Sequence, residues 1–441
     1  MKKIVILGGG ESGYGSAVLA KRKGFDTFLS DAGNIAEHYR RALESEGIEY
    51  EQGGHSEERI LAADLVVKSP GIPEKAPMVK ALREKGVPIV SEIEFARPFS
   101  KGRTLCITGS NGKTTTTTLT HRILADAGYD VAVGGNIGRS YALNVATDDK
   151  EWYVLELSSF QLDGCYDFVA DVAVLMNITP DHLDRYDYKF QNYVDSKMRI
   201  LQGHTPKEHF IYCGDDQTIA AEVEKRHPLS RLFPFGKGNI VGHTATVELD
   251  GKSLSIDLDK LQIKGLHNAY NAMAATLAAL AAGVSTEQIE QTLYAFEGVE
   301  HRLERVAEIG GVEWINDSKA TNVDSVWYAL ESMTRPTVWI AGGTDKGNDY
   351  EPLKEFVGRK VKTLVCMGVN NEKLLEEFRG IVPVYNTSSL DECISVCSRV
   401  AVKGDAVLLS PACASFDLFK NYEQRGKLFK QKVLELQENE K

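Results

Sequence analysis

Cysteine is sparse in this 441-residue sequence: seven residues are scattered along the chain, and none of them forms a Cys-x-x-Cys pair. An odd, scattered set argues against a disulfide framework and against a zinc site built from closely spaced thiolates. We therefore expect reduced thiols and a cytoplasmic location.

The sequence also lacks long apolar runs and an excess of positive charge. No window approaches the roughly 20 apolar residues of a membrane span. The opening MKKIVILGGG has two lysines, but its apolar run ends at Leu7, which is too short for a signal peptide and is typical of a buried strand. Lys and Arg number 51 against 62 Asp and Glu, for a net charge of −11. We expect neither a nucleic-acid partner nor a membrane, and a single chain acting on small molecules.

The length and the hydrophobic pattern predict three α/β domains. At about 150 residues per domain, the chain has room for roughly three. Short apolar runs alternate with helix-length segments throughout, which favours mostly parallel sheets flanked by helices. The polar segment Ala96–Arg103 and the charged segment Glu297–Val306 interrupt this pattern. We therefore expect domains at 1–97, 98–298 and 299–441.

Twelve apolar runs are the predicted strands. The first domain has KIVILGG, DTFLSD, ADLVVKSPG and VPIVSE, and the second has RTLCITG, WYVLELSS, DVAVLMNITP and EHFIYCGD. The third has VEWINDS, TVWIAGG, KTLVCMG and DAVLLSPA.

A glycine-rich turn follows the first predicted strand. Gly8, Gly10 and Gly13 fit G-x-G-x-x-G, and Asp31 ends the next strand. In dinucleotide-binding folds such amides meet a pyrophosphate and the acidic residue binds a ribose hydroxyl. The same glycines also occur in tight turns without any cofactor, and a diphosphate of another kind would fit them equally. An NAD-dependent oxidoreductase therefore remains an alternative.

The segment TGSNGKTTTTT, Thr108–Thr118, resembles a phosphate-binding loop with unusual spacing. The common pattern has four residues between its first glycine and the closing Gly-Lys-Ser/Thr. Here only Ser110 and Asn111 separate Gly109 from Gly112. Either this is a chance Gly-Lys pair, or it belongs to a nucleotide-binding family with a shorter loop.

The context of this loop is the one that a phosphate site requires. It lies between the predicted strand Leu105–Thr108 and a predicted helix that runs to about Ala127. Amides at the start of the helix would point toward the anion, Lys113 would reach the β and γ oxygens, and Thr114 would hold Mg²⁺. A coincidental Gly-Lys-Thr at a helix start is the alternative.

Two further polar residues stand at strand ends. Glu156 lies in WYVLELSS, and His182 follows DVAVLMNITP. If these strands flank the loop strand, both side chains lie beside the phosphates, because parallel sheets form their sites at the carboxyl ends of the strands. A hard cation accepts a carboxylate more readily than an imidazole, so Glu156 is the more typical ligand.

Other polar residues permit two interpretations each. Lys197 looks like an ordinary surface lysine. Asn268 and Asn271 share a helix face, which fits either capping or a nucleotide pocket. Arg302 sits in a charged stretch that fits an interdomain linker, and Lys346 lies in the glycine-rich AGGTDKGND, which would also serve as a turn alone.

Taken in order, these motifs resemble those of the Mur ligase family, the ATP-dependent amide-forming enzymes of peptidoglycan synthesis. The matching segments are TGSNGKTT, GGNIG (134–138), LELSSFQL (155–162), NITPDHLDRY (177–186), SK (196–197), HNAYNAMAA (267–275), HRLE (301–304) and NDSKATN (316–322). The resemblance implies a Rossmann-like UDP-sugar-binding domain, a P-loop ATPase-like central domain and a Rossmann-like domain that binds the amino acid.

Two C-terminal segments narrow the resemblance. AGGTDKGND at 341–349 and SPACASFDLFKNYEQRG at 410–426 are most similar to the member that adds D-glutamate, and the Asp-Asn-Pro-Arg signature of the lysine- or diaminopimelate-adding member is absent. The implied reaction is ligation of D-glutamate to UDP-N-acetylmuramoyl-L-alanine through an acyl phosphate, with release of ADP and phosphate. The alternative is another Mur-type or folylpolyglutamate-type ligase that adds a different amino acid.

The resemblance also implies roles for individual residues. The expected catalytic residues are Lys113, Asn136, His182 and Lys197. The expected ATP-binding residues are Gly109, Ser110, Asn111, Gly112, Lys113, Thr114, Thr115, Asn268, Asn271, Arg302, Asp317 and Lys319. The expected substrate-binding residues are Ser12, Asp31, Ser69, Gly71, Asn136, Thr321, Lys346, Ser415 and Tyr422. Two Mg²⁺ ions would be held by Thr114, Glu156, His182 and a carbamylated Lys197.

Overall fold

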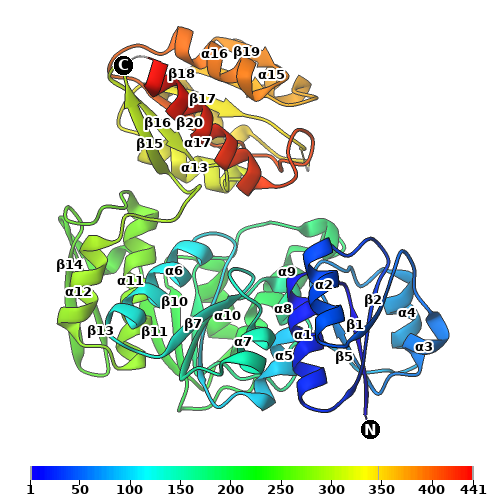
Figure 1. The fold of residues 1–441 in the computed structure, drawn as a ribbon. Coiled ribbons are helices and arrows are strands. Elements are labelled where there is room, and N and C mark those ends of the chain that lie inside the picture. Colours follow the sequence, from blue (N-terminus) through cyan, green and yellow to red (C-terminus); the bar gives the residue numbers. More distant parts are fainter. Residues whose placement is uncertain (1, 346, 440–441) are drawn as a thin grey trace. The chain divides into compact units, whose positions relative to one another are not determined.

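The computed structural model describes residues 2–345 and 347–439 (Figure 1). It divides into two compact units. Unit 1 comprises Met1–Leu261 and Ala269–Ala295, and unit 2 comprises Gln262–Asn268 and Phe296–Lys441. Each unit has its own sheets.

Unit 1 begins with a five-stranded parallel sheet in the order β3-β2-β1-β4-β5. Its strands are β1 (Lys3–Leu7), β2 (Asp26–Asp31), β3 (Glu49–Gln52), β4 (Leu65–Lys68) and β5 (Ile89–Val90). Its helices are α1 (Glu11–Arg22), α2 (Glu37–Ser45), α3 (Glu57–Leu61), α4 (Pro77–Glu84) and α5 (Glu92–Ala96). The strand order reverses at β1, so the loops after β1 and β4 meet at a switch point, the usual place for a ligand.

The second sheet of unit 1 has six parallel strands in the order β11-β10-β9-β6-β8-β7. The strands are β6 (Arg103–Thr108), β7 (Val131–Gly135), β8 (Trp152–Glu156), β9 (Val172–Leu175), β10 (His209–Cys213) and β11 (Arg231–Phe235). The helices are α6 (Lys113–Asp126), α7 (Tyr141–Thr147), α8 (Ser159–Leu162), α9 (Phe190–Met198) and α10 (Gln217–Arg226). The loop strand β6 thus lies between β8 and β9, as the assignment of Glu156 and His182 requires.

A small antiparallel sheet, which the sequence pattern did not predict, follows in unit 1. Its strands are β12 (Ile240–Val241), β13 (Thr244–Leu249) and β14 (Lys252–Asp257). Helix α11 (Leu266–Ala282) comes next, and the first residues of this helix cluster with unit 2. Ser285 caps the start of helix α12 (Thr286–Ala295), because its hydroxyl accepts a bond from the amide of Gln288.

Unit 2 contains a six-stranded sheet in the order β15-β16-β20-β17-β18-β19, in which only β15 is antiparallel. The strands are β15 (Glu304–Ile309), β16 (Val312–Asn316), β17 (Thr337–Ala341), β18 (Val361–Met367), β19 (Val384–Thr387) and β20 (Ala406–Leu409). The helices are α13 (Val323–Ser332), α14 (Lys354–Lys360), α15 (Glu372–Phe378), α16 (Leu390–Val400) and α17 (Tyr422–Asn439). Two apolar cores, one on each face, contain Trp339 and Trp314 respectively.

The fold class predicted from the sequence is confirmed: the major sheets are mostly parallel and flanked by helices. The central strands are apolar on both faces, as expected when helices cover both sides of a parallel sheet. All seven cysteines are buried and none is in a disulfide. Among the described residues, the model has no helix with the length and apolar character that crossing a membrane would require.

Candidate functional site

The loop between β6 and α6 depends on two glycines. Gly109 has φ +151° and Gly112 has φ +80°, a range that disfavours side chains with a Cβ. A Cβ on Gly112 would lie 2.6 Å from Oδ1 of Asn271, and one on Gly109 would lie 2.9 Å from Cβ of Met176. The short spacing is therefore a specific, closely packed backbone structure.

A segment after β9 holds this loop in place. The amide of Ser110 donates to the carbonyl of Asn177 (2.9 Å), and the amide of Asn111 donates to the side-chain oxygen of Asn177 (2.8 Å). The Asn177 side-chain nitrogen in turn donates to the Asn111 carbonyl (3.1 Å), and the Ser110 hydroxyl donates to the Thr179 carbonyl (2.8 Å). Sequence reasoning missed Asn177 and Thr179 as functional residues, although both lie in the quoted motif NITPDHLDRY.

Two lysines converge on the first residue of the loop. The Lys113 ammonium donates to the carbonyls of Gly109 (2.8 Å) and Ser110 (2.9 Å), and the Lys197 ammonium donates to the same Gly109 carbonyl (2.8 Å). Lys197 is only 1% exposed, so the expectation of a surface lysine was wrong. Its helix, α9, turns this residue inward, where it also lies 4.6 Å from the ring centre of Tyr193.

The environment of Lys197 disfavours a positive charge. Burial holds the pKa of its ammonium well below the ordinary value, and the neighbouring Lys113 lowers it further. Carboxylates of Asp181, Glu156 and Asp163 act in the opposite direction.

Glu156 ends β8 next to the loop strand and is 1% exposed. The side-chain nitrogen of Asn136 donates to Oε1 of Glu156 (2.8 Å), and the Asn136 amide donates to the Glu156 carbonyl (2.8 Å). This close approach requires Gly135, whose φ is +91° and whose added Cβ would lie 2.3 Å from the Glu156 carbonyl oxygen. Two predicted site residues, Asn136 and Glu156, are therefore in direct contact.

His182 lies in the loop after β9, at the same edge of the sheet. Its backbone is left-handed, with φ +52°, and its side chain is 43% exposed. Nε2 lies 3.6 Å from a carboxylate oxygen of Asp181, and the ring packs edge-on against Phe160 at 5.1 Å. The exposed imidazole is accessible to a ligand.

The threonine run lies on the first turns of α6. Four of its five members, Thr114, Thr115, Thr116 and Thr117, are buried, and Thr118 is half-buried. The Thr116 hydroxyl donates to the side-chain oxygen of Asn271 (3.2 Å), which brings α11 against the loop. Asn268 instead donates from its side chain to the Lys264 carbonyl (2.9 Å), which is a local contact at the start of α11.

The first sheet of unit 1 carries a cavity of about 630 Å³, lined by residues that include Asp31, His55, Gly71 and Met78. Asp31 accepts bonds from the amides of Gly9 (2.6 Å) and Gly33 (2.7 Å), so its carboxylate orders the glycine-rich turn. Among the predicted substrate residues, Asp31 and Gly71 line this cavity.

Ser12 and Ser69, two more predicted substrate residues, lie at the switch point of this sheet. Their hydroxyl oxygens are 3.5 Å apart, and Ser69 packs so closely on Gly8 that a Cβ there would lie 2.6 Å from its Oγ.

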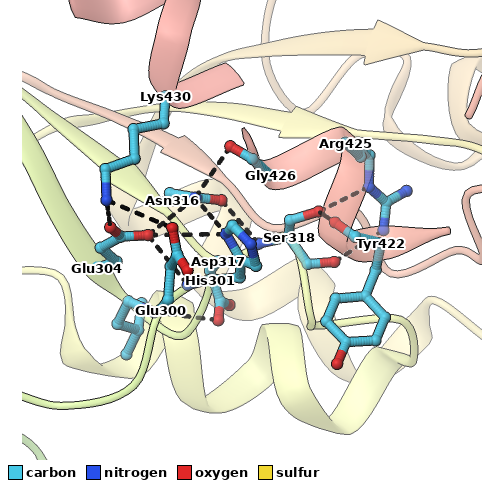
Figure 2. A network of polar contacts seen from close by, with 11 residues as sticks. Glu300, His301, Glu304, Asn316, Asp317, Ser318, Tyr422, Arg425, Gly426 and Lys430 are labelled. Atoms are coloured by element: carbon cyan, nitrogen blue, oxygen red, sulfur yellow. Dashed lines mark hydrogen bonds and ion pairs between the residues drawn. The ribbon is translucent and has the colours of Figure 1, made fainter. Parts of the chain in front are cut away.

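In unit 2 a strained turn that contains His301 is bonded to the loop that carries Asp317, one of the predicted nucleotide-binding residues (Figure 2). His301 and Leu303 are left-handed, with φ of +65° and +44°. The Leu303 amide donates to Oδ1 of Asp317 (3.2 Å), and the Lys319 amide donates to the His301 carbonyl (3.1 Å). The turn that carries Arg302 is thus bonded directly to the loop after β16.

Asp317 is 6% exposed and also accepts a bond from the Ser410 hydroxyl (2.7 Å). Burial raises the pKa of this carboxyl to about 7, although the Ser410 bond and the charge of Arg302 act against the shift.

Asn316 is the centre of the network in Figure 2. Its side-chain nitrogen lies within hydrogen-bond distance of Nδ1 of His301 (2.9 Å), Oε2 of Glu304 (3.0 Å) and the Gly426 carbonyl (3.2 Å), and its two hydrogens are shared among these three acceptors. Ligand atoms of Glu300, His301 and Glu304 lie within 4.8 Å of one another, an arrangement that would suit a cation. The Lys430 ammonium, however, bonds to Glu304 and lies 3.5 Å from Glu300, so a protein charge already neutralises these carboxylates.

The C-terminal motif folds against the same loop. Arg425, 1% exposed, donates to the carbonyl (2.8 Å) and hydroxyl (3.0 Å) of Ser318, and that hydroxyl donates to the Tyr422 carbonyl (2.8 Å). The Lys319 ammonium lies 5.2 Å from the ring centre of Tyr422. Arg425 and Ser318 were not predicted as site residues, although both lie inside quoted motifs.

Unit 2 contains three other predicted substrate residues, of which Thr321 and Ser415 are among the described residues. Ser415 is buried, and the Thr321 amide donates to the Lys319 carbonyl (2.9 Å), which keeps Thr321 beside the same loop. Lys346 lies outside the described residues.

Comparisons with known proteins match the whole chain. Family models described as "Mur ligase MurD-like, N-terminal domain", "Mur ligase middle domain" and "Mur ligase, glutamate ligase domain" match residues 2–91, 107–279 and 301–413. A UDP-N-acetylmuramoylalanine–D-glutamate ligase from Bacteroides fragilis is 52% identical over 99% of this chain and 100% of its own. The enzyme of the same name from Christiangramia forsetii is 50% identical over the same shares.

Solved structures support the fold. A UDP-N-acetylmuramate-alanine ligase from Thermotoga maritima aligns with a TM-score of 0.63 at 19% identity, covering 99% of this chain and 100% of that one. A folylpolyglutamate synthase from Mycobacterium tuberculosis aligns with a TM-score of 0.59 at 14% identity, covering 75% of this chain and 92% of that one.

Proposed function

This chain belongs to the Mur ligase family, and from that premise we propose that it joins D-glutamate to UDP-N-acetylmuramoyl-L-alanine at the expense of ATP. The observation that carries this proposal is the convergence of Lys113, Lys197 and Glu156 on the short glycine loop at the carboxyl edge of the second sheet. Loop amides and the Lys113 ammonium are suited to phosphate oxygens, and the buried Glu156 carboxylate beside them is suited to the accompanying cation.

ATP and Mg²⁺ are the cofactors of the family, and the residues present suit them. Amides at the start of a helix point toward an anion bound there, and the Lys113 ammonium already lies over the loop. Thr114 and Glu156 would offer oxygen ligands, and His182 an exposed imidazole. When bound, the cation would neutralise charge on the transferring phosphoryl group.

Lys197 would be carbamylated and would contribute to a second cation site with His182. As an ammonium, Lys197 repels Mg²⁺, whereas a carbamate presents two anionic oxygens. Its location supports the proposal, because it is buried beside Lys113 and the Glu156 carboxylate.

The reaction proceeds in two steps. The terminal carboxylate of the L-alanyl substrate attacks the γ-phosphorus of ATP, which gives an acyl phosphate and ADP. The amine of D-glutamate then adds to the acyl carbon, loses a proton, and phosphate leaves with the electrons of the broken C–O bond. Phosphate is a good leaving group and a carboxylate oxygen is not, so the coupling to ATP makes the amide accessible in water. Positioning contributes most of the rate.

We assign the UDP-sugar substrate to unit 1, because its first sheet has both a cavity and a glycine-rich turn. The region 1–97 would bind the UDP-sugar, with the cavity beside Asp31 and Gly71 accepting its nucleoside end and the turn near Ser12 and Ser69 its diphosphate. Asn136, which bonds to Glu156, would contact the muramoyl end near the reacting carboxylate.

Further roles are proposed for α11 and unit 2. Residues 98–298 would be the ATP-binding domain and 299–441 the amino-acid-binding domain. Additional nucleotide contacts would come from Asn268, Asn271, Arg302, Asp317 and Lys319. The D-glutamate contacts would come from Thr321, Lys346, Ser415 and Tyr422. Since ATP and nucleotide-sugars are made inside cells, we place the reaction in the cytoplasm and expect a single chain to perform it.

A panel of substrates tests the proposed function. With ATP and Mg²⁺, release of ADP and phosphate should require both UDP-N-acetylmuramoyl-L-alanine and D-glutamate. Equal or faster turnover with L-lysine or diaminopimelate would instead identify a family member with a different amino acid. Tight NADH binding without any ATP hydrolysis would contradict the proposal and favour an oxidoreductase.

A further inference from the structure

A carboxylate with no role in the proposed chemistry is buried beside the loop that carries Asn136. Glu92, the first residue of α5, is 2% exposed. Its Oε1 accepts a bond from the Ser140 hydroxyl and another from the amide of Ala142 (3.0 Å). Both donors lie at the start of α7, so Glu92 bonds to the end of this loop.

The position of Glu92 is energetically costly. Its Oε2 is buried without a hydrogen-bond partner, and burial raises the pKa of the carboxyl to about 7, with the charge of Glu11 adding to the shift. Bonds from Ser140 and the α7 amides only partly offset this. Perturbed buried carboxyls of this kind occur more often at functional sites than elsewhere.

Ser140 links Glu92 to the rest of the unit. Its hydroxyl accepts a bond from the amide of Leu143 (3.1 Å), so the hydroxyl hydrogen is available for Glu92. The Ser140 amide donates to Oε1 of Glu11 (2.8 Å), at the start of α1. Helix α1 approaches so closely that a Cβ on Gly15 would lie 1.9 Å from the Ser140 hydroxyl oxygen. Ser140 is therefore hydrogen-bonded to two carboxylates, those of Glu92 and Glu11.

The other end of the loop is bonded to the site. Asn136 donates twice to Glu156, from its amide and its side chain. Between these ends, Gly138 is left-handed, with φ +68°, and Gly134 pairs with Arg139 in an isolated bridge. Residues 136–140 are thus held at both ends, with little freedom to shift at one end alone.

We propose that Glu92 is a positioning residue of the ligase, which through Ser140 holds residues 136–140 so that the Asn136 side chain stays aligned on Glu156. This inference rests on the proposed function. Glu11, adjacent to the glycine-rich turn, shares the task by binding the Ser140 amide. The loop between β7 and α7 is therefore fixed by acidic residues whose partners lie far away in the sequence.

The chain supplies a matched control on the same short helix. Glu94 of α5 accepts three amide bonds, from Tyr166, Asp167 and Phe168, each of 2.9 Å. Glu94→Ala therefore also removes a carboxylate that binds backbone amides, but those amides belong to a different loop. Glu92→Gln is the conservative variant, because its side-chain oxygen can still accept from Ser140 and Ala142.

The experiment measures steady-state ligation and amide hydrogen exchange of the full-length chain. We expect Glu92→Ala to lower kcat by about 10- to 100-fold, the scale of loss for a misplaced reacting group, with the KM for ATP within about twofold. Exchange should accelerate in residues 136–143. Glu94→Ala should accelerate exchange in residues 166–168 with kcat within about twofold of the unmodified chain, and Glu92→Gln should restore most of the kcat.

Different results would overturn the positioning role of Glu92 and the proposed ligase function. Equal kcat values for Glu92→Ala and Glu94→Ala, or faster exchange at 136–143 with undiminished turnover, would overturn the positioning role alone. No ADP release by the unmodified chain would overturn the proposed ligase function itself. If Glu92→Ala does not fold, Ser140→Ala removes only the bridging hydroxyl, and unchanged kcat in that variant would equally overturn the inference.

Discussion

Two opposing electrostatic effects meet at Lys197. Burial and the adjacent Lys113 disfavour its ammonium, while Glu156 and two aspartates favour it. Its ammonium donates a hydrogen bond to the Gly109 carbonyl, at the start of the loop between β6 and α6. A group in this position influences the loop and any cation beside Glu156 together.

Lys197→Ala tests the proposed carbamate. We expect ADP release to fall by about 100-fold or more, the scale seen when a group that stabilises transition-state charge is removed. A short-chain carboxylate such as formate should restore part of the rate, because it would return oxygen ligands to the vacated space, whereas chloride should not.

The exposed Lys189, at the start of the same helix, provides the control. Lys189→Ala should leave the rate unchanged and insensitive to formate. Normal turnover in Lys197→Ala would rule out the proposed role.

At the scale of the element, α6 has a left-handed glycine at each end. Gly112 precedes its first residue with φ +80°, and Gly128 follows its end with φ +84°. The two differ in their surroundings: a Cβ on Gly112 would strike Oδ1 of Asn271, whereas nothing lies within 4 Å of a Cβ on Gly128. An alanine at Gly112 would therefore combine backbone strain with a steric clash, whereas an alanine at Gly128 would cause backbone strain alone.

We expect Gly128→Ala to lower the unfolding free energy by about 1–2 kcal/mol, the cost of a left-handed alanine, and Gly112→Ala to lower it by more because of the added clash. Only Gly112→Ala should also raise the KM for ATP, by about 10-fold or more, because the clash displaces the loop that would bind the phosphates. Chemical denaturation and ATP titrations measure the two effects. A similar KM for both variants would contradict the assignment of this loop.

At the scale of the whole molecule, both units contain a buried carboxyl whose pKa is raised to about 7: Glu92 in unit 1 and Asp317 in unit 2. The folded chain therefore retains these protons to a higher pH than the unfolded chain. Wherever the folded state binds more protons, the free energy of unfolding falls as the pH rises. Each group stabilises the fold fully below its ordinary pKa, 4.5 for Glu92 and 3.8 for Asp317, and that contribution is lost as the pH rises through 7.

Glu92→Gln isolates one of these contributions. Between pH 5 and 8, its unfolding free energy should rise relative to that of the unmodified chain, by up to about 3 kcal/mol, because glutamine has no proton to lose. Urea denaturation at both pH values measures the difference. The variant should retain a residual pH dependence from Asp317, and an identical pH dependence in both proteins would contradict the buried charge of Glu92.

The strands that the sequence pattern missed share a physical cause. In the three mostly parallel sheets, β3, β7, β11, β15 and β19 were not predicted, and each lies at a sheet edge. Edge strands are partly exposed and lack the continuous apolar run that marks a central strand, as EYEQ and VYNT illustrate. The central strands were predicted because burial on both faces leaves a signal within a few residues.

The candidate site likewise contains residues that could be predicted from the sequence and contacts that could not. Gly109, Gly112, Glu156 and His182 could be predicted because each belongs to a short motif at the end of a predicted strand. The contacts of Glu92 with Ser140 and of Asn316 with Gly426 could not, because the partners are separated by 48 and 110 residues and no local pattern pairs them. The residue pattern around Lys197 predicts a surface lysine, because nothing near it in sequence indicates that α9 turns it inward.

By itself, the sequence determined the strand-and-helix alternation, the two glycines of the loop between β6 and α6, and the polar residues at the ends of central strands, because these depend on neighbours a few residues away. Tertiary structure alone decided the strand order that brings β8 and β9 beside β6, and it alone decided the burial of Lys197. It also decided the hydrogen bonds that Ser140 donates to Glu11 and Glu92. Those features arise from packing between distant segments, where the cost of burying a charge is set by the surroundings and not by the residue's own neighbours in the chain.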